Sequence, residues 1–467
     1  MHIAPEPASS SSLQIALDER PVGGLQILVV VICMMVGLAE GADLAVLGLV
    51  APKIAKEWSL ATGSFGPVFS SGSLGLLLGG ILFGFIGDRF GRKRALAWAC
   101  LIMTFGTLGT SFASSLNELL IGRLISGVGF GGIIPASTAL VTELMPNRRK
   151  AGAICLVIVS GSVGVLLCSI VSRAMAGSDW RVMLWMVAAA CLVATFLVFF
   201  ALPESPSFLL LRERTRQSAF KILKRMGIDP DSIELPAANA PAAANFHSLS
   251  MGESLAALFS GSRAVGTSLI WLQMLGIASI ISFMTNWLPL IMAHGGDHDS
   301  TALGAVTTHI STSILAGFLF PLVLGRWFSA ERFIIFVLAG AAASIGLIGY
   351  ATAIDDAGLL TIAFLAEGFF VSGSLYLVYA PMTQYYSTDV RTFGAGAASA
   401  FGRIGNFGSP LVAGAMISAG MSVSQVFALF TIPLIMAAVA AFLFALHLRN
   451  KRDEGTGSAI GRMAASR

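Results

Sequence analysis

The chain has 467 residues, of which 55% are hydrophobic and only 12% are charged, and its mean hydropathy is +0.82. This composition excludes an ordinary water-soluble globular protein. The formal net charge of +4 says less about partners than the positions of the basic residues do, and we expect no nucleic-acid partner and no obligatory protein partner. Apolar residues occur in blocks of about 20, the length that a helix needs to cross a bilayer.

Twelve apolar blocks are predicted to be transmembrane helices, six in each half of the chain. They fall near 25–49, 64–86, 95–115, 119–144, 151–175 and 182–202, and then near 264–292, 302–325, 333–353, 358–382, 393–419 and 422–448. We therefore expect an all-α membrane protein with two six-helix bundles. The predicted parts are an N-terminal tail (1–24), a first bundle (25–202), a linker (203–263), a second bundle (264–448) and a C-terminal tail (449–467).

The basic residues predict the orientation of these helices. If the N-terminus is cytoplasmic, 23 of the 29 Lys and Arg residues fall in cytoplasmic segments. Because short cytoplasmic loops carry an excess of Lys and Arg, both termini and the basic linker are expected inside the cell. We interpret the basic run of the linker as a solvated helix near anionic lipid headgroups, with a specific partner site as the alternative.

A short loop between the second and third blocks has the sequence GFIGDRFGRKR, from Gly84 to Arg94. It resembles the signature loop of the major facilitator superfamily, and this resemblance implies two six-helix bundles that rock around a central cavity. In that family the loop helps to close the cytoplasmic side. The gating residues expected here are Gly84, Asp88, Arg89, Gly91 and Arg92, to which we add Glu143 near the end of the fourth block.

A second motif, EGADLAVLGLVAPKIAKEW from Glu40, is similar to the acidic motif of aromatic acid/proton symporters. Glu40 and Ala42 stand where that motif has an Asp and an aromatic residue. The segments that begin at Arg123, Leu202, Asn286, Glu367 and Phe401 extend the resemblance over nearly the whole membrane region. It implies a multi-pass protein of the cell inner membrane that imports a small aromatic carboxylate, such as benzoate, hydroxybenzoate or a lignin-type acid. The proton gradient is the expected energy source, and no cofactor is expected.

Charged residues inside the apolar blocks are the candidate functional groups, because a charge in hydrocarbon costs about 3 kcal/mol or more and usually faces a cavity. Asp43 and Glu40 are three residues apart on one helix face, where two carboxylates discourage each other's ionisation. We expect them to carry the proton. The alternative for Asp43 is a buried structural ion pair with Arg123, which lies at a similar depth in the fourth block.

Arg403 lies near the middle of the eleventh block, where a guanidinium can bind a carboxylate through two parallel hydrogen bonds. We expect it to anchor the substrate, and a salt bridge to Glu367 is the alternative. The other residues of the predicted substrate site are Arg123, Asn286, Trp287, Glu367, Phe369, Tyr376 and Tyr379. For each aromatic residue, ordinary packing is an equal alternative.

Further features of the sequence allow more than one interpretation. His294, Asp297, His298 and Asp299 resemble a metal cluster, but a solvated loop is the better interpretation and no metal site is expected. His309 is either a proton relay or a packed core residue. No nucleophile, base and orienting group recur on one face, so an enzyme is not expected. The alternatives to import are an exporter or a sugar or organic-acid porter of the same fold, and a membrane sensor that does not transport.

Overall fold

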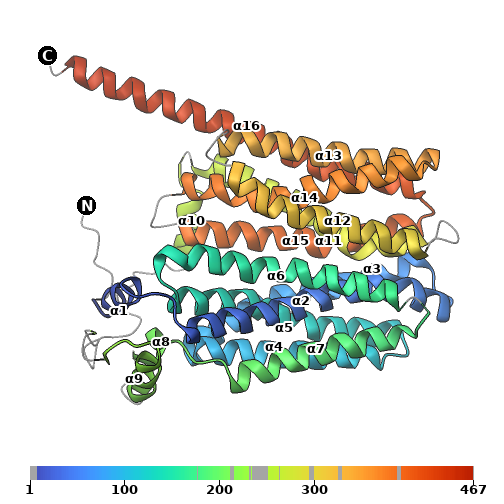
Figure 1. Cartoon of the computed structure of the whole chain (residues 1–467). Coiled ribbons are helices and arrows are strands. Elements are labelled where there is room, and N and C mark those ends of the chain that lie inside the picture. Colours follow the sequence, from blue (N-terminus) through green and yellow to red (C-terminus); the bar gives the residue numbers. More distant parts are fainter. Residues whose placement is uncertain are drawn as a thin grey trace. The chain divides into compact units, whose positions relative to one another are not determined.

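The computed structural model describes residues 8–175, 177–210, 215–230, 233, 251–261, 263–293, 299–323, 329–386 and 391–465. Within these residues the regular structure is entirely helical (Figure 1). The chain divides into two compact units, one of Met1–Ile54 and Ser71–His247 and the other of Ala55–Ser70 and Ser248–Arg467. The C-terminal end of α2 and the N-terminal end of α3 thus belong to the second unit, whereas the sequence-predicted first bundle holds them within 25–202.

The first unit consists of long apolar helices with short helices at one end. Its helices are α1 (Ala8–Asp18), α2 (Gly24–Glu57), α3 (Gly66–Phe90), α4 (Arg92–Ser111), α5 (Leu116–Leu144), α6 (Asn147–Ala174), α7 (Trp180–Phe200), α8 (Pro206–Leu210) and α9 (Arg216–Arg225). The long helices pack through glycine. A Cβ on Gly127 of α5 would lie 2.2 Å from the carbonyl oxygen of Gly72 in α3, so only glycine allows these two backbones to approach so closely. Gly127 therefore lets α5 pack closely against α3.

The second unit has the same construction. The short η1 (Thr62–Phe65) belongs to it, together with α10 (Met251–Leu258), α11 (Arg263–Ala293), α12 (Asp299–Val323), α13 (Ala330–Ile354), α14 (Ala357–Tyr385), α15 (Arg391–Ser418) and α16 (Val423–Ala465). α11 packs along α15 and α16, and α14 packs along α12 and α13. α16 continues through residues expected to form a C-terminal tail.

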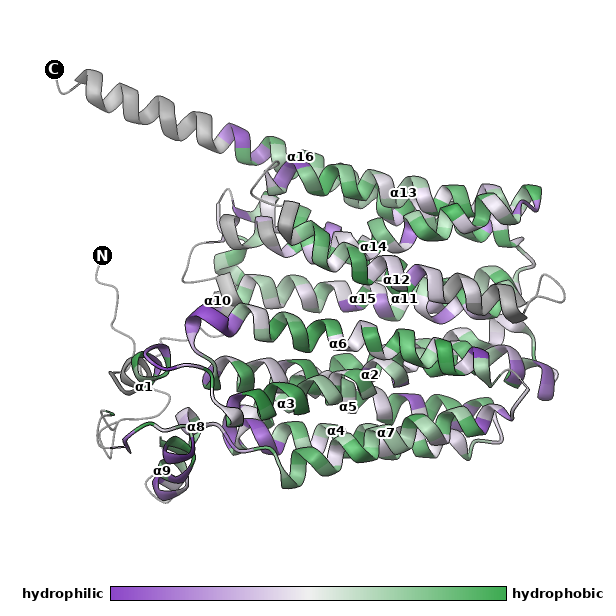
Figure 2. Ribbon diagram, in the orientation of Figure 1, coloured by the Kyte–Doolittle hydropathy of each residue, from purple (hydrophilic) through white to green (hydrophobic). Residues whose placement is uncertain are grey.

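Nine helices within the described residues are long and apolar enough to cross a membrane. Hydrophobic residues run along the length of the long helices, and hydrophilic residues gather on α9 and near helix ends (Figure 2). Large apolar side chains such as Ile81, Phe105 and Phe200 are more than 60% exposed. Exposed apolar surface of this extent is expected where lipid, rather than water, surrounds the helices. The chain is therefore a multi-pass membrane protein.

A small hydrophobic core lies apart from the long helices, where α1 packs against α8 and α9. Its buried members are Leu13, Leu17, Leu209, Leu210, Ala219, Leu223, Ile228 and Ile233. α9 turns Ala219 and Leu223 into this core and leaves Lys221, Lys224 and Arg225 exposed. The apolar face of α9 is therefore covered by protein, and its basic face remains in the solvent.

Candidate functional site

A buried ion pair connects three helices of the first unit. Asp43 of α2 has no exposed surface and Arg123 of α5 is 4% exposed. Nη1 of Arg123 lies 3.3 Å from Oδ2 of Asp43 and donates a 3.0 Å hydrogen bond to the Asp43 carbonyl oxygen. The hydroxyl of Thr107 in α4 donates a 2.6 Å hydrogen bond to the other carboxylate oxygen, Oδ1. The ion pair of Asp43 with Arg123 is the arrangement given above as the alternative for Asp43, and Thr107 is an additional partner that the sequence did not indicate.

The surroundings explain how the helices hold this pair. The single proton of the Thr107 hydroxyl is shared with the carbonyl oxygen of Met103, 2.9 Å away and one turn earlier in α4, which fixes the hydroxyl beside Asp43. A Cβ on Gly72 of α3 would lie in ordinary van der Waals contact, at 3.8 Å, with the Arg123 guanidinium, so α3 packs directly beside that group. Glu40 lies one turn before Asp43 on α2 and is partly buried. A water-excluded carboxylate with one cationic and one hydroxyl partner can exchange its charge for a proton.

The signature loop forms a second polar cluster in the same unit. Nη1 of Arg92 lies 2.6 Å from Asp88, and its Nε lies 3.3 Å from Glu143. Glu143 also accepts a hydrogen bond from the hydroxyl of Ser205. Glu204 accepts from the backbone N–H groups of Lys93, at 2.9 Å, and Ser205, at 3.0 Å. The loop residues are thereby tied to the end of α5 and to the segment before α8.

The backbone conformation at Gly91 favours glycine. Its φ is +108°, a region that side-chain-bearing residues rarely adopt, and a Cβ there would lie 2.2 Å from Oε2 of Glu204. Asp88, Gly91, Arg92 and Glu143 thus lie together as expected. Gly84 and Arg89 are exposed, and the guanidinium of Arg89 lies over the rings of Phe85 and Phe90. Glu204 was not among the predicted gating residues, but it lies in the LPESP segment that begins at Leu202 and extends the family resemblance.

The second unit contains its own buried polar pair. Nδ1 of His309 in α12 contacts Oε2 of Glu367 in α14 at hydrogen-bond distance. Glu367 has no exposed surface, and the side chain of His309 retains 11%. Glu367 was expected either in the substrate site or paired with Arg403. In the described part of the chain its ion-pair partner is His309.

The remaining residues of the predicted substrate site lie on α11, α14 and α15. Arg403 is partly buried. The side-chain N–H of Asn286 donates a 2.8 Å hydrogen bond to the carbonyl oxygen of Ser282, whose hydroxyl donates, also at 2.8 Å, to the carbonyl oxygen of Asn406. α11 and α15 thus meet at Ser282 and Asn406. Gly402 and Gly405 pack against Met274 and Leu275, so Asn286 lies further along α11 than the level of Arg403.

The predicted aromatic residues are in different environments. Trp287 is fully buried. Phe369 makes an edge-to-face contact with Phe320 of α12, with ring centres 4.9 Å apart. Tyr376 lies against Gly317 of α12, whereas Tyr379 is 38% exposed. Phe369 and Tyr376 have the packing contacts that were their alternative interpretation. The predicted polar loop with His294, Asp297 and His298 lies outside the described residues, and the side chain of Asp299 does as well.

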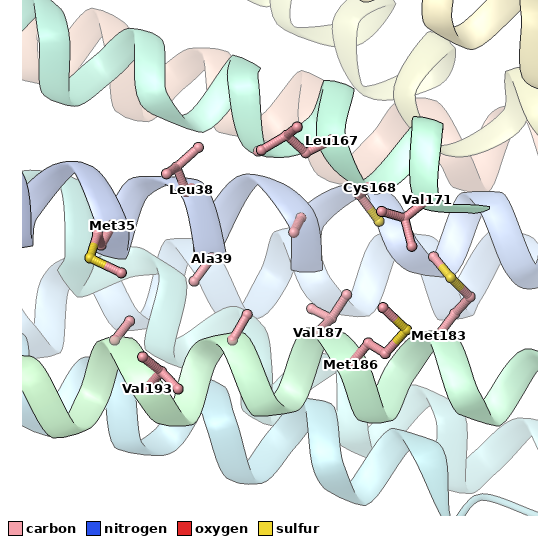
Figure 3. Close-up of a pocket in the computed structure, with 14 residues that line it drawn as sticks. Met35, Leu38, Ala39, Leu167, Cys168, Val171, Met183, Met186, Val187 and Val193 are labelled. Carbon is pink, nitrogen blue, oxygen red and sulfur yellow. The ribbon is translucent and has the colours of Figure 1, made fainter. Parts of the chain in front are cut away.

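A cavity of about 370 Å³ lies between α2, α6 and α7 (Figure 3). Its lining includes Met35, Leu167, Met183 and Met186, and none of its lining side chains is charged. It lacks a group that could bind a carboxylate, so the candidate site remains with the buried charged residues.

Long apolar helices around buried ion pairs define a polytopic membrane protein with ionisable groups in its interior. The family model described as the Major Facilitator Superfamily matches residues 33–327, more than half of the chain. The chain belongs to the major facilitator superfamily, and it is a transporter rather than an enzyme.

Three curated relatives extend over nearly the whole chain. The gallate transporter of Pseudomonas putida is 28% identical over 91% of this chain and 93% of the relative. The 3-(3-hydroxy-phenyl)propionate transporter of Escherichia coli K12 is 29% identical, covering 88% and 92%. The 4-hydroxybenzoate transporter PcaK of Acinetobacter baylyi is 25% identical, covering 94% and 95%.

Solved structures agree with the fold. A D-xylose-proton symporter is 19% identical and aligns with a TM-score of 0.68, covering 90% of this chain and 97% of the other. The xylose transporter XylE from E. coli in an inward open conformation is 18% identical and aligns with a TM-score of 0.70, covering 90% and 96%. These similarities identify the major facilitator fold and carry no information on the substrate.

Proposed function

We propose that this chain is a proton-coupled symporter that imports a small aromatic carboxylate by alternating access. The relatives named for gallate, 3-(3-hydroxy-phenyl)propionate and 4-hydroxybenzoate each cover at least 88% of the chain. All three compounds combine an aromatic ring with a carboxylate. The same chemistry is therefore the best-supported substrate class here.

The observation that carries proton coupling is the buried contact of Asp43 with Arg123 and Thr107. Protonation neutralises the Asp43 carboxylate and removes its attraction to the guanidinium. Arg123 is then a buried cation without a counter-charge, a state that costs several kcal/mol. A substrate carboxylate relieves this cost, so proton binding and substrate binding favour each other. Glu40, on the same face of α2, shares this one proton with Asp43 in the proposal.

Arg403 is the proposed substrate anchor in the second unit. Because Arg403 is only partly buried, part of its side chain is accessible to a substrate. A planar guanidinium matches the geometry of a carboxylate. Asn286 provides an amide that can bind a ring hydroxyl, such as those of gallate. The proposed aromatic surroundings are Trp287, Phe369, Tyr376 and Tyr379.

We assign gating to the cluster of Asp88, Gly91, Arg92 and Glu143, with Gly84 and Arg89 of the same loop. Its charged residues lie at the ends of α3, α4 and α5 and can exchange partners when those helices move. Glu204 belongs to this cluster through its hydrogen bonds to Lys93 and Ser205. A gate of this kind stabilises one state of the transporter relative to another.

The proposed topology has twelve transmembrane helices, with both termini in the cytoplasm and the protein in the cell inner membrane. It adds α4, α12 and α15 to the nine helices that satisfy the length and hydropathy criteria. These three helices have 20, 25 and 28 residues, enough to cross a hydrocarbon core of about 30 Å. The basic residues favour the cytoplasmic termini.

A substrate screen tests the proposal. The full chain is reconstituted into lipid vesicles, an inward proton gradient is imposed, and uptake of radiolabelled 4-hydroxybenzoate, gallate, benzoate and xylose is measured. The aromatic carboxylates should accumulate and xylose should not. Accumulation of xylose alone would identify a sugar porter, loss of preloaded acid would identify an exporter, and binding without flux would identify a sensor.

A further inference from the structure

The contact between His309 and Glu367 has no role in the proposed function and differs from an ordinary buried ion pair. Oε2 of Glu367 contacts Nδ1 of His309. The other carboxylate oxygen, Oε1, is also buried, and within the described residues it has no hydrogen-bond partner. A carboxylate so enclosed exposes half of its hydrogen-bonding capacity to an apolar interior, which is unfavourable in the ionised state.

In the described part of the chain, one titratable side chain contacts Glu367. α14 packs against α11, α12, α13 and α15. Within their described residues, His309 of α12 is the one charged or titratable side chain in hydrogen-bond or ion-pair contact with Glu367. Arg403, the charged residue of α15 nearest the middle of that helix, makes no such contact with Glu367. The carboxylate therefore lacks the permanent cation that Asp43 has in Arg123.

The two partners together can hold or release one proton. Imidazole and carboxylate form a neutral pair when one proton is shared between them, and a pair of charge −1 when it leaves. His309 keeps 11% of its side-chain surface exposed, whereas Glu367 keeps none. The imidazole is thus the partner through which a proton can enter, and Glu367 is the partner that retains it.

The position in the fold matches that of the first ion pair. α5 begins after the N-cap Ser115 and α14 after the N-cap Asp356, and both caps accept a hydrogen bond from the third residue of their helix. Arg123 and Glu367 then lie about 12 Å and about 16 Å along their helices. Each unit has therefore a buried charged residue in the first half of a corresponding helix, held by a residue from a neighbouring helix.

We propose that His309 and Glu367 form a second proton-binding site, located in the second unit and separate from Asp43. This inference rests on the proposed function for its role in transport. The ligand is a proton because a metal ion needs more donors than one carboxylate and one imidazole provide. For a monovalent aromatic carboxylate, two protons would make uptake electrogenic, with a net charge of +1 per cycle.

The binding step is tested without any substrate. Infrared difference spectra of the full chain in lipid, taken between alkaline and acidic pH, detect carboxyl groups that gain a proton. Glu367→Gln should remove one carboxyl band, and His309→Gln should shift the pH midpoint of that band. Glu118→Gln, the same change at an exposed position, should leave the band in place. Circular dichroism identifies variants that do not fold. If Glu367→Gln does not fold, His309→Gln serves as the test.

Each result separates the alternatives. A band that persists unchanged in Glu367→Gln overturns the inference, because another carboxyl group then accounts for it. A band that responds to Na⁺ at constant pH also overturns it, in favour of a metal site. In vesicles, the wild-type chain should carry about one net positive charge per substrate, and Glu367→Gln about none. Wild-type chain that shows the titrating band but takes up no aromatic acid would refute the proposed function and leave the proton site standing.

Discussion

At the scale of single residues, the hydroxyl of Thr107 is the part of the candidate site whose role a single substitution tests most directly. Its 2.6 Å hydrogen bond to Asp43 is a bond to a charged group, which contributes about 1.5–3 kcal/mol. Thr107→Val preserves the shape and removes this bond. We expect the initial rate of proton-driven uptake to fall about tenfold or more, since 1.4 kcal/mol corresponds to a factor of ten.

Thr104→Val is the matched control for this prediction. Thr104 lies one turn earlier on α4 and its hydroxyl contacts Cys100 and Thr195, with no contact to Asp43. Both variants should lose some thermal stability, but Thr104→Val should retain uptake close to the wild-type rate. Equal uptake by the two variants would remove Thr107 from the coupling site.

Gly91 provides a second residue-scale prediction, on stability. An alanine there combines a positive φ with a Cβ 2.2 Å from Glu204. Gly91→Ala should lower the free energy of unfolding by about 1–3 kcal/mol, measured by thermal or chemical unfolding in detergent. Gly109→Ala is the comparison, because Gly109 is helical and no atom lies within 4 Å of its added Cβ. If the two alanines prove equally tolerated, the loop conformation described here is not the stable one.

At the scale of elements, the apolar blocks of the sequence predicted the long helices well because lipid imposes a simple rule on them. Blocks of about 20 apolar residues must form helices that satisfy their own backbone groups. The contact of Asp43 with Arg123 followed from depth alone. The ends of the long helices were less predictable. α2 continues to Glu57 and α16 to Ala465, because a helix can extend past the apolar block.

Contacts that depend on how the helices are rotated against one another could not be predicted from the sequence. Thr107 gave no signal in the sequence, and His309 was expected only as a proton relay or a packed core residue. The rotation of α4 and α12 about their axes turns these residues toward Asp43 and Glu367. The core between α1, α8 and α9 was missed for a related reason. Its leucines occur in a short tail and in a basic linker, and neither segment alone buries enough apolar surface to indicate a fold.

The docking of α1 makes an element-scale prediction about pH. Asp18 accepts hydrogen bonds from the backbone N–H of Asn147 at 2.6 Å and from its side chain at 2.8 Å, at the start of α6. Slight desolvation acts to raise the pKa of Asp18, but these hydrogen bonds, with Gln14 and Lys150, leave it below the ordinary value. A depressed carboxyl pKa means stabilisation that is present above the unfolded-state value and is lost as the pH falls through the folded-state value.

The docked state of α1 should therefore loosen on acidification below about pH 4, the ordinary pKa range of Asp. Hydrogen exchange of α1, corrected for the intrinsic rate, measures this opening. Protection should decrease with falling pH in the wild-type chain and should be low and nearly independent of pH in Asp18→Asn. Undiminished protection in Asp18→Asn would mean that the hydrophobic contacts of Leu13 and Leu17 hold α1 without Asp18.

At the scale of the whole molecule, each unit combines an apolar exterior with a buried polar pair. In the first unit the pair has a permanent cation, Arg123, and in the second it has a titratable imidazole, His309. Retaining such groups is costly in a membrane, so a transport function is the simplest physical reason for their presence. Protonation of Asp43 leaves Arg123 without a counter-charge, and a substrate carboxylate that supplies this charge makes the two ligands depend on each other.

The most direct test of this account compares the wild-type chain with Asp43→Asn in lipid vesicles. Two quantities are measured with radiolabelled 4-hydroxybenzoate: accumulation driven by an imposed proton gradient, and exchange of labelled for unlabelled acid at equal pH on both sides. The account predicts that Asp43→Asn abolishes accumulation but retains exchange, because substrate can still cross when no proton has to be released. Full accumulation by Asp43→Asn against a concentration gradient would contradict it.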